Sequence, residues 1–132
     1  MKIVVLIARI LLGLLFLVFG LNGILHFIPQ PPMPPSDATT FATILMTHKY
    51  MTFVAVLQVI GGLLVLVGRF VPLGLTILAP ILVNILLFHF LLMPQGVAIG
   101  LICTVLEIFL IFEYRAAFLK LLHPDPRNSS SA

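Results

Sequence analysis

Four long apolar runs constrain this chain more than any other feature of its sequence. They cover residues 3–28, 50–68, 71–92 and 97–122, to within a residue or two. A helix needs about 20 consecutive apolar residues to cross the ~30 Å hydrocarbon layer of a bilayer. The runs do not alternate with period two, and only helices or closed barrels satisfy their backbone groups in lipid. They therefore predict four transmembrane helices.

The composition excludes an ordinary soluble domain. The chain is 61% hydrophobic and only 8% charged, whereas roughly a quarter of the residues of a soluble domain are charged. Its mean hydropathy is +1.27. Four spans take about 80 residues and leave no room for a soluble catalytic domain. We predict an all-α transmembrane four-helix bundle over residues 1–123, followed by a disordered polar tail over 124–132.

Prolines and capping residues mark the breaks between the runs. The first run is longer than the 7–15-residue core of a signal peptide, so we expect a retained helix. The prolines within 29–35 are expected to end it, because proline cannot donate to the helical ladder. Ser36 or Asp37 can then cap a short helix over 37–48. This segment either lies on the membrane surface or extends the second span outward.

The cations predict the orientation. With an even number of spans, both termini share one side with the turn around Arg69. Six of the seven Lys and Arg residues fall on that side and only Lys49 lies opposite, so the positive-inside rule places both termini in the cytoplasm. The pI near 9.5 then reflects charges at the inner leaflet, and no basic tract indicates nucleic-acid binding. The one cysteine, Cys103, is expected to be a small core residue.

Polar residues inside the spans are the candidate functional groups, because lipid makes them costly. Six of them are candidate ligand-binding residues. Five lie in the outer half of the predicted bundle, and the sixth, Glu107, lies near mid-bilayer: Asn22, His26, Gln58, Asn84, His89 and Glu107. They either join helices through hydrogen bonds or line a polar pocket for a lipid-soluble ligand such as a quinone. Haem would require His26 and His89 to converge on one iron, and no other metal site is predicted.

The spacing of these residues refines the prediction. Asn22 and His26 lie four apart on one face of the first span. Asn84 and His89 lie about 140° apart around the third, unless Pro80 distorts that helix. Near the cytoplasmic side, Arg9 is expected to pair with Glu113, at a similar depth, or with Glu107, about 9 Å farther outward. The glycines of the first two spans are expected to let helices pack closely: Gly13, Gly20, Gly23, Gly61 and Gly62.

Several short motifs resemble those of DoxX-like proteins. The first helix and loop carry Arg9-Ile-Leu-Leu-Gly13, Phe19-Gly20-Leu-Asn22-Gly23, His26-Phe27 and Pro-Pro-Met-Pro at 31–34. The likeness continues in Gly68-Arg69-Phe-Val-Pro72-Leu, in Leu78-Ala-Pro80-Ile-Leu-Val-Asn84-Ile-Leu-Leu-Phe88-His89, in Leu106-Glu107 and in Tyr114-Arg115-Ala-Ala-Phe118. The resemblance implies a compact four-helix protein of the bacterial inner membrane, in a family with some subunits linked to quinone-dependent oxidation and with other accessory or assembly factors.

Three functions follow from these observations. The first is a quinone- or redox-associated accessory subunit with an outer polar pocket. It is not a complete enzyme alone, because the chain has no flavin, nucleotide or iron–sulfur motif. The second is a non-enzymatic assembly, chaperone or scaffold protein. A small transporter ranks behind both, since four short helices would need oligomerisation. The expected partners are the bilayer and either another protein or further copies of this chain.

Overall fold

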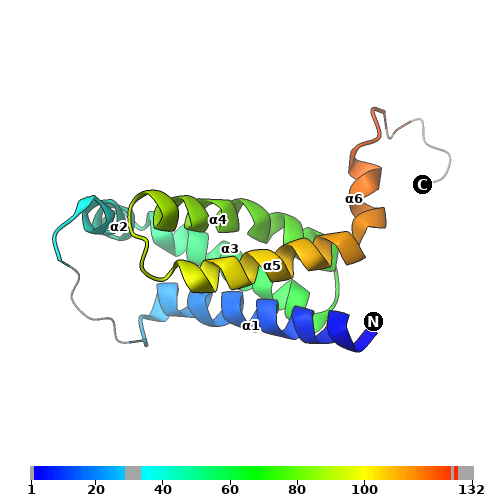
Figure 1. The fold of residues 1–132 in the computed structure, drawn as a ribbon, viewed down its shortest axis with the longest axis horizontal. Coiled ribbons are helices and arrows are strands. Elements are labelled where there is room, and N and C mark those ends of the chain that lie inside the picture. Colours follow the sequence, from blue (N-terminus) through cyan, green and yellow to red (C-terminus); the bar gives the residue numbers. More distant parts are fainter. Residues whose placement is uncertain (1, 29–33, 126, 128–132) are drawn as a thin grey trace.

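Six helices make up the described part of the chain, which in a computed structural model comprises residues 2–28, 34–125 and 127. They are α1 (Lys2–Leu25), α2 (Asp37–Thr47), α3 (Tyr50–Val67), α4 (Val71–Leu91), α5 (Val97–Glu113) and α6 (Arg115–Leu121). Four of them, α1, α3, α4 and α5, run along the length of the molecule, while α2 and α6 lie at opposite ends (Figure 1). The predicted all-helical architecture is confirmed for these residues.

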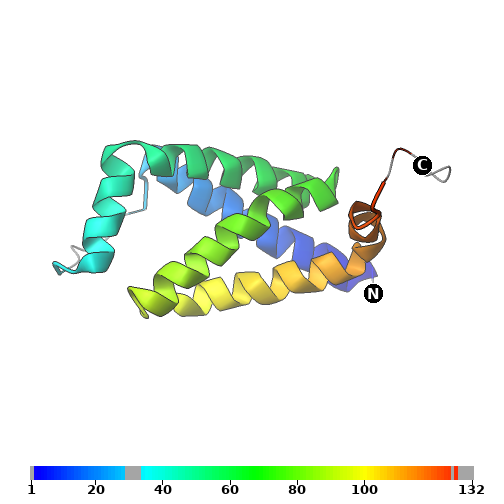
Figure 2. The same ribbon diagram turned by 90° about the horizontal axis from the view of Figure 1, so that it is seen from above.

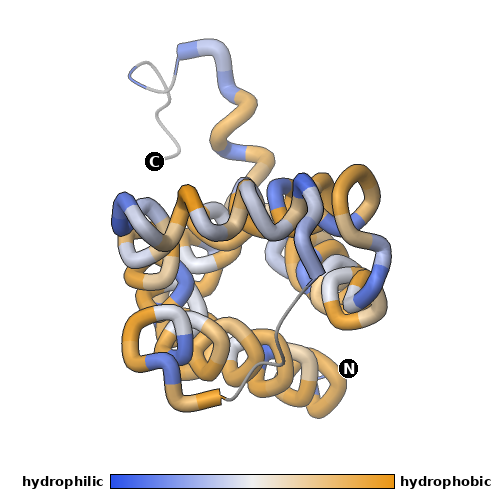
Figure 3. Tube along the Cα trace, turned by 90° about the vertical axis from the view of Figure 1, so that its left-hand side faces the viewer, coloured by the Kyte–Doolittle hydropathy of each residue, from blue (hydrophilic) through white to orange (hydrophobic). Residues whose placement is uncertain are grey.

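Three helices, α1, α3 and α4, are each long and apolar enough to cross a membrane. The number rises to four if α5 and α6 are taken together as one broken span. Hydrophobic residues dominate the helices in the end-on view of Figure 3. The chain is therefore a protein of membrane-embedded helices.

The expectation of one continuous helix over 97–122 is wrong, because the chain bends by 78° between α5 and α6. The bend lies at Tyr114, whose φ of −101° and ψ of 23° are not helical. The guanidinium of Arg115 donates to the carbonyl of Phe112 at 2.9 Å and lies 4.5 Å from the centre of its ring. Because a side chain satisfies this terminal carbonyl, α5 can end here without continuing straight.

The first span also ends earlier than predicted, at Leu25 instead of Ile28. His26 has a left-handed φ of 55°. Its N–H donates to the Asn22 carbonyl at 2.7 Å, and the Ile28 N–H donates to Asn22 Oδ1 at 2.8 Å. One asparagine thus serves two amides that follow the helix. The prolines at 29, 31 and 32, which were expected to end it, lie outside the described residues.

The predicted helix over 37–48 is present as α2. The Ser36 hydroxyl caps it by accepting from the Thr39 N–H at 3.2 Å. A left-handed Lys49, with φ of 61°, separates α2 from α3, and α2 runs across the direction of α3 (Figure 2). It is therefore a separate element and not an outward extension of the second span. Phe41 of α2 approaches Phe88 of α4, with ring centres 6.0 Å apart.

Helix α1 packs most extensively against α3, and α4 packs against both α3 and α5. A methyl group added at Gly62 would lie 2.9 Å from the Gly13 carbonyl oxygen and 2.8 Å from the Leu17 nitrogen. The two backbones are therefore in direct contact, and the predicted glycine packing is present. The fully buried side chains in the core are Leu12, Val65, Leu75, Leu78 and Leu110. Close fit matters here because lipid provides no hydrophobic drive between helices.

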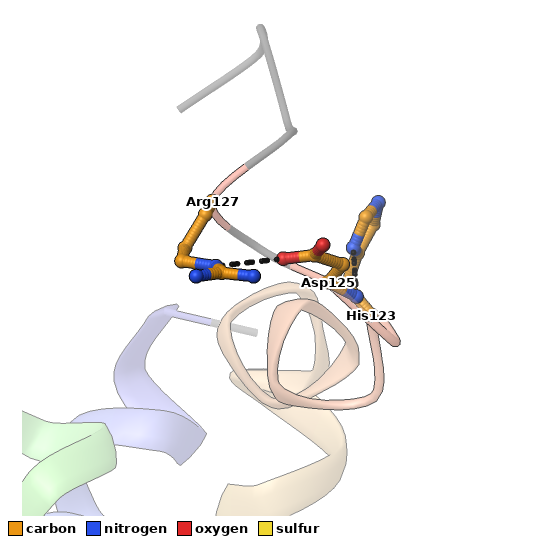
Figure 4. A network of polar contacts seen from close by, with 3 residues as sticks. All are labelled: His123, Asp125 and Arg127. Atoms are coloured by element: carbon orange, nitrogen blue, oxygen red, sulfur yellow. Dashed lines mark hydrogen bonds and ion pairs between the residues drawn. The ribbon is translucent and has the colours of Figure 1, made fainter.

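The predicted tail falls mostly outside the described residues. Within its described part, Arg127 Nε lies 3.2 Å from Asp125 Oδ1, and the Asp125 N–H donates to His123 Nδ1 at 3.2 Å (Figure 4). Both members of the ion pair are solvent-accessible. Such exposed pairs contribute about 0–1 kcal/mol, so this contact orders the chain after α6 only weakly.

Candidate functional site

Arg9 of α1 holds the end of α3. Its Nε donates to the Val65 carbonyl at 3.1 Å, and its guanidinium also reaches the Leu66 carbonyl at 3.4 Å. Helix α3 ends in Gly68, which has a left-handed φ of 87° and lies directly against the guanidinium. The last carbonyls of a helix have no helical donors and carry partial negative charge. They are thus a suitable partner for an arginine inside a membrane protein.

The predicted pairing of Arg9 with Glu113 or Glu107 is not formed. Arg9 instead binds the backbone of α3, and the Asp125–Arg127 contact is the ion pair found among the described residues. The physical reason is proximity. Helices α1 and α3 are the most closely packed pair, so the carbonyls at the end of α3 lie within reach of the guanidinium.

Three of the six ligand candidates bind backbone groups close to them in sequence. Asn22 accepts from the Ile28 N–H, as described above. The Asn84 side-chain N–H donates to the Pro80 carbonyl at 2.9 Å. His89 Nδ1 lies 3.0 Å from the Met93 carbonyl oxygen, just beyond the end of α4. All three groups therefore act at a helix end or one turn from the proline in α4.

The other members of the outer cluster lie apart from these contacts. His26 is exposed just after α1. Gln58 is only 9% exposed, on the face of α3 that packs against Gly20 of α1. Within residues 2–28, 34–125 and 127, no hydrogen bond joins any two of the six candidates. A shared pocket for them is thus not visible in their polar contacts.

Glu107 differs from the other candidates. Its side chain is only 3% exposed, and neither carboxyl oxygen has a hydrogen-bond partner among the described residues. It shares the buried face of α5 with Gly100, Cys103 and Leu110. A buried polar group without a partner typically costs about 1–3 kcal/mol. Glu107 is therefore the one unsatisfied polar side chain in an otherwise apolar part of the described core.

The exposure of a polar stripe on α4 was not expected from the sequence. Thr76 and Asn84 lie on the exposed face of α4, together with Pro80. Thr76, Pro80 and Asn84 follow one another at intervals of four residues and so share a helix face, but this spacing does not show that the face is exposed. From the sequence, Asn84 was expected either to join helices through hydrogen bonds or to line a pocket, since nothing in an apolar helix shows which side faces outward.

Potential metal ligands are dispersed in the described structure. Among residues 2–28, 34–125 and 127, no three His, Cys, Asp or Glu side chains lie close enough to hold a metal ion. An open, apolar hollow is found on the outer side of α5, lined by Leu101, Ile102, Val105 and Leu106. Its lining suits a lipid tail or an apolar helix and offers no side-chain hydrogen bond.

These features define an integral membrane protein of closely packed apolar helices, in which several polar side chains bind the helix ends. The DoxX family model matches residues 4–91, which is more than half of the chain. The protein therefore belongs to the DoxX family, as its motifs suggested. The matched part covers α1 to α4, while Glu107 lies beyond it. No curated protein and no solved structure shows a significant match.

Proposed function

We propose that this protein is a non-enzymatic accessory subunit that assembles or holds other membrane proteins. The observation that supports this proposal is that three polar side chains of the spans form hydrogen bonds to helix ends of the same protein. Arg9 binds the end of α3, Asn22 the end of α1, and His89 the end of α4. Groups already committed to helix ends stabilise the framework and are not free to bind a substrate.

The outer surface supports the same proposal. Large apolar side chains project from every long helix, and on α5 they surround the apolar hollow described above. In a membrane, such a surface can receive either lipid or the helix of another protein. A closely packed core with an apolar exterior fits a scaffold that works through helix contacts.

Photo-crosslinking tests the accessory role. A photoreactive residue replaces Val105 beside the hollow, with Ile7 on α1, which is also exposed, as the control. We expect one discrete adduct with another membrane protein at position 105. His26→Ala and His89→Ala should retain it, because an assembly role does not need these imidazoles as ligands. Adducts with lipid alone at both positions, or loss of the protein adduct in the folded histidine variants, would overturn the proposal.

The same proposal includes the location and orientation of the chain. We place it in the bacterial inner membrane with both termini cytoplasmic, α5 as the fourth span of a four-helix bundle, and α6 at the cytoplasmic surface. The distribution of Lys and Arg supports this orientation. The N-terminal end of α1, the α3–α4 turn and α6 all lie at one end of the molecule (Figure 1), as the even number of spans requires.

A second candidate function, quinone binding in an accessory redox subunit, is favoured by Glu107 alone. A buried carboxyl without a partner offers both a donor, when protonated, and an acceptor. The carbonyl or hydroxyl of a quinone or quinol would satisfy it in an apolar setting. In this case the protein would bind the quinone, and a partner would supply the electron donor.

The Glu107→Leu variant separates these two candidates. It removes an unsatisfied buried carboxyl, so we expect the free energy of unfolding in detergent to rise by about 1–3 kcal/mol. If quinone binds there, the quinone that co-purifies, measured by mass spectrometry, falls with Glu107→Leu and not with the control Glu113→Gln. Equal quinone content in both variants and in an unrelated membrane protein would eliminate the quinone candidate and leave the accessory role intact.

A further inference from the structure

Exposed polar side chains deep within the long helices are confined to one face of α4. Thr76 and Asn84 both lie more than one turn from the ends of α4, and both are exposed. Among the described residues of α1, α3 and α5, every polar side chain at such depth is buried or partly buried: Arg9, Gln58, Thr104 and Glu107. The outward face of α4 therefore differs in chemistry from the rest of the lipid-facing surface.

Pro80 adds a backbone acceptor to this face. Proline has no N–H, so it cannot donate to the carbonyl of Thr76 four residues earlier. The Thr76 hydroxyl does not replace this donor, because it donates to the Pro72 carbonyl at 2.8 Å. Pro80 itself is exposed. The exposed turn of α4 at Pro80 thus lacks one regular helical hydrogen bond.

Asn84 has hydrogen-bonding capacity to spare. One of its side-chain N–H groups donates to the Pro80 carbonyl. Its second N–H and its Oδ1 have no partner in the described part of the chain. An amide facing hydrocarbon loses its hydrogen bonds to water without replacement, which is costly. A partner that covers this face must therefore present both a hydrogen-bond donor and an acceptor at the depth of Asn84.

We propose that this face binds the same face of a second copy, with the two α4 helices parallel about a twofold axis along the membrane normal. Such an axis places the two Asn84 side chains opposite each other at equal depth. The free N–H of each then meets the free Oδ1 of the other, so the amide pairs with itself without any further polar partner.

The surroundings of Asn84 fit a helix–helix contact. Leu73, Val83 and Leu87 lie on the same exposed face and supply apolar side chains above and below the amide. Helix α2 approaches α4 through Phe41 and Phe88 but leaves Asn84 uncovered. This dimer is independent of the proposed accessory role, since it requires no other protein.

Disulfide crosslinking in native membranes tests the dimer. In a Cys103→Ala background, which has no other cysteine, a cysteine is placed at Leu87 on the α4 face. Ile108→Cys on α5 is the control, because this residue is at least as exposed. With a mild oxidant we expect a crosslinked dimer from Leu87→Cys and none from Ile108→Cys. Equal crosslinking at both positions would indicate random collision and overturn the proposal.

A second variant tests the amide itself. Asn84→Leu removes the proposed hydrogen bonds from an exposed position that suits leucine, so the protomer should still fold, as a thermal melt can verify. We expect dimer association to weaken about 3- to 30-fold, and Asn84→Gln, which keeps an amide, to recover part of it. Unchanged dimerisation in a folded Asn84→Leu protein, or crosslinking of Leu87→Cys to a different protein, would overturn the assignment.

Discussion

At the scale of single residues, Arg9 and Gly68 form one structural unit. The guanidinium of Arg9 lies beside Gly68 and binds the carbonyls of Val65 and Leu66. Gly68 also adopts a left-handed conformation that side-chain-bearing residues rarely take. Two separate requirements therefore select glycine at this position. One is the backbone angle, and the other is room for a charged side chain from another helix.

Gly68→Ala should accordingly be more destabilising than Gly96→Ala. Both glycines have nearly the same φ, 87° and 86°, so the left-handed backbone costs about 1–2 kcal/mol in each variant. A methyl at position 68 also overlaps the Arg9 guanidinium, whereas at position 96 its nearest neighbour is a His89 ring atom at 3.2 Å. We expect a further loss of about 1–3 kcal/mol at position 68, measured as the free energy of unfolding in detergent.

Arg9→Ala provides the control for this prediction. In that background the extra loss should disappear, and the two alanine variants should become similarly destabilising. An extra loss that persists without the arginine would mean that the backbone angle alone explains the requirement for glycine.

At the scale of elements, close helix approach organises the bundle. The contact of Gly13 with Gly62 brings the backbones of α1 and α3 together, and Gly61 meets Gly74 in the same way between α3 and α4. Gly100 of α5 is different, because a methyl there would find only the side chains of Leu86 and Ile85, at 3.4 and 3.6 Å. The α4–α5 contact is therefore less tight at this point.

These contacts predict opposite outcomes for two alanine variants. Gly62→Ala should destabilise the protein by about 1–3 kcal/mol or more, because the obstructing atoms are backbone and cannot rotate away. Gly100→Ala should be neutral or stabilising by up to about 1 kcal/mol, since alanine favours the helix and fits the space. Thermal melts of the two variants in the same detergent would show the difference. Similar destabilisation by both would contradict the difference in packing between Gly62 and Gly100.

At the scale of the whole molecule, the chain ends and the turns divide between two sides. The N-terminal end of α1, the α3–α4 turn and α6 lie at one end, and α2 lies at the other (Figure 1). The cations follow the same division, with Lys49 alone on the side of α2. The proposed orientation therefore depends on two observations of different kinds.

Cysteine labelling in intact cells tests the orientation. In a Cys103→Ala background, a cysteine at Lys49 should react with a membrane-impermeant maleimide added outside, because the proposal places it on the outer side. A cysteine at Arg127 should react only after the cells are opened. The reverse pattern would invert the orientation, and reaction at both sites in intact cells would indicate an odd number of spans.

Much of this architecture could be predicted from the sequence. The apolar runs predicted the long helices, the capping candidates Ser36 and Asp37 predicted the start of α2, and the motifs predicted the DoxX family. Each of these depends on properties read along the chain: run length, a capping oxygen before free amides, or a short pattern of residues. The bend at Tyr114 could not be predicted, because Glu113 and Arg115, which flank it, fit a straight helix equally well in the sequence. The contact of Arg115 with the Phe112 carbonyl appears only in the structure.

The tertiary structure alone decided which way the polar groups face. A helix that is apolar on all sides has no moment to orient it, so its rotation depends on how its small residues fit the neighbouring helices. That fit buries Glu107, exposes Asn84 and brings Arg9 to the end of α3. The sequence by itself determined that the chain is a bundle of membrane helices, and helix packing determined where its few polar side chains can act.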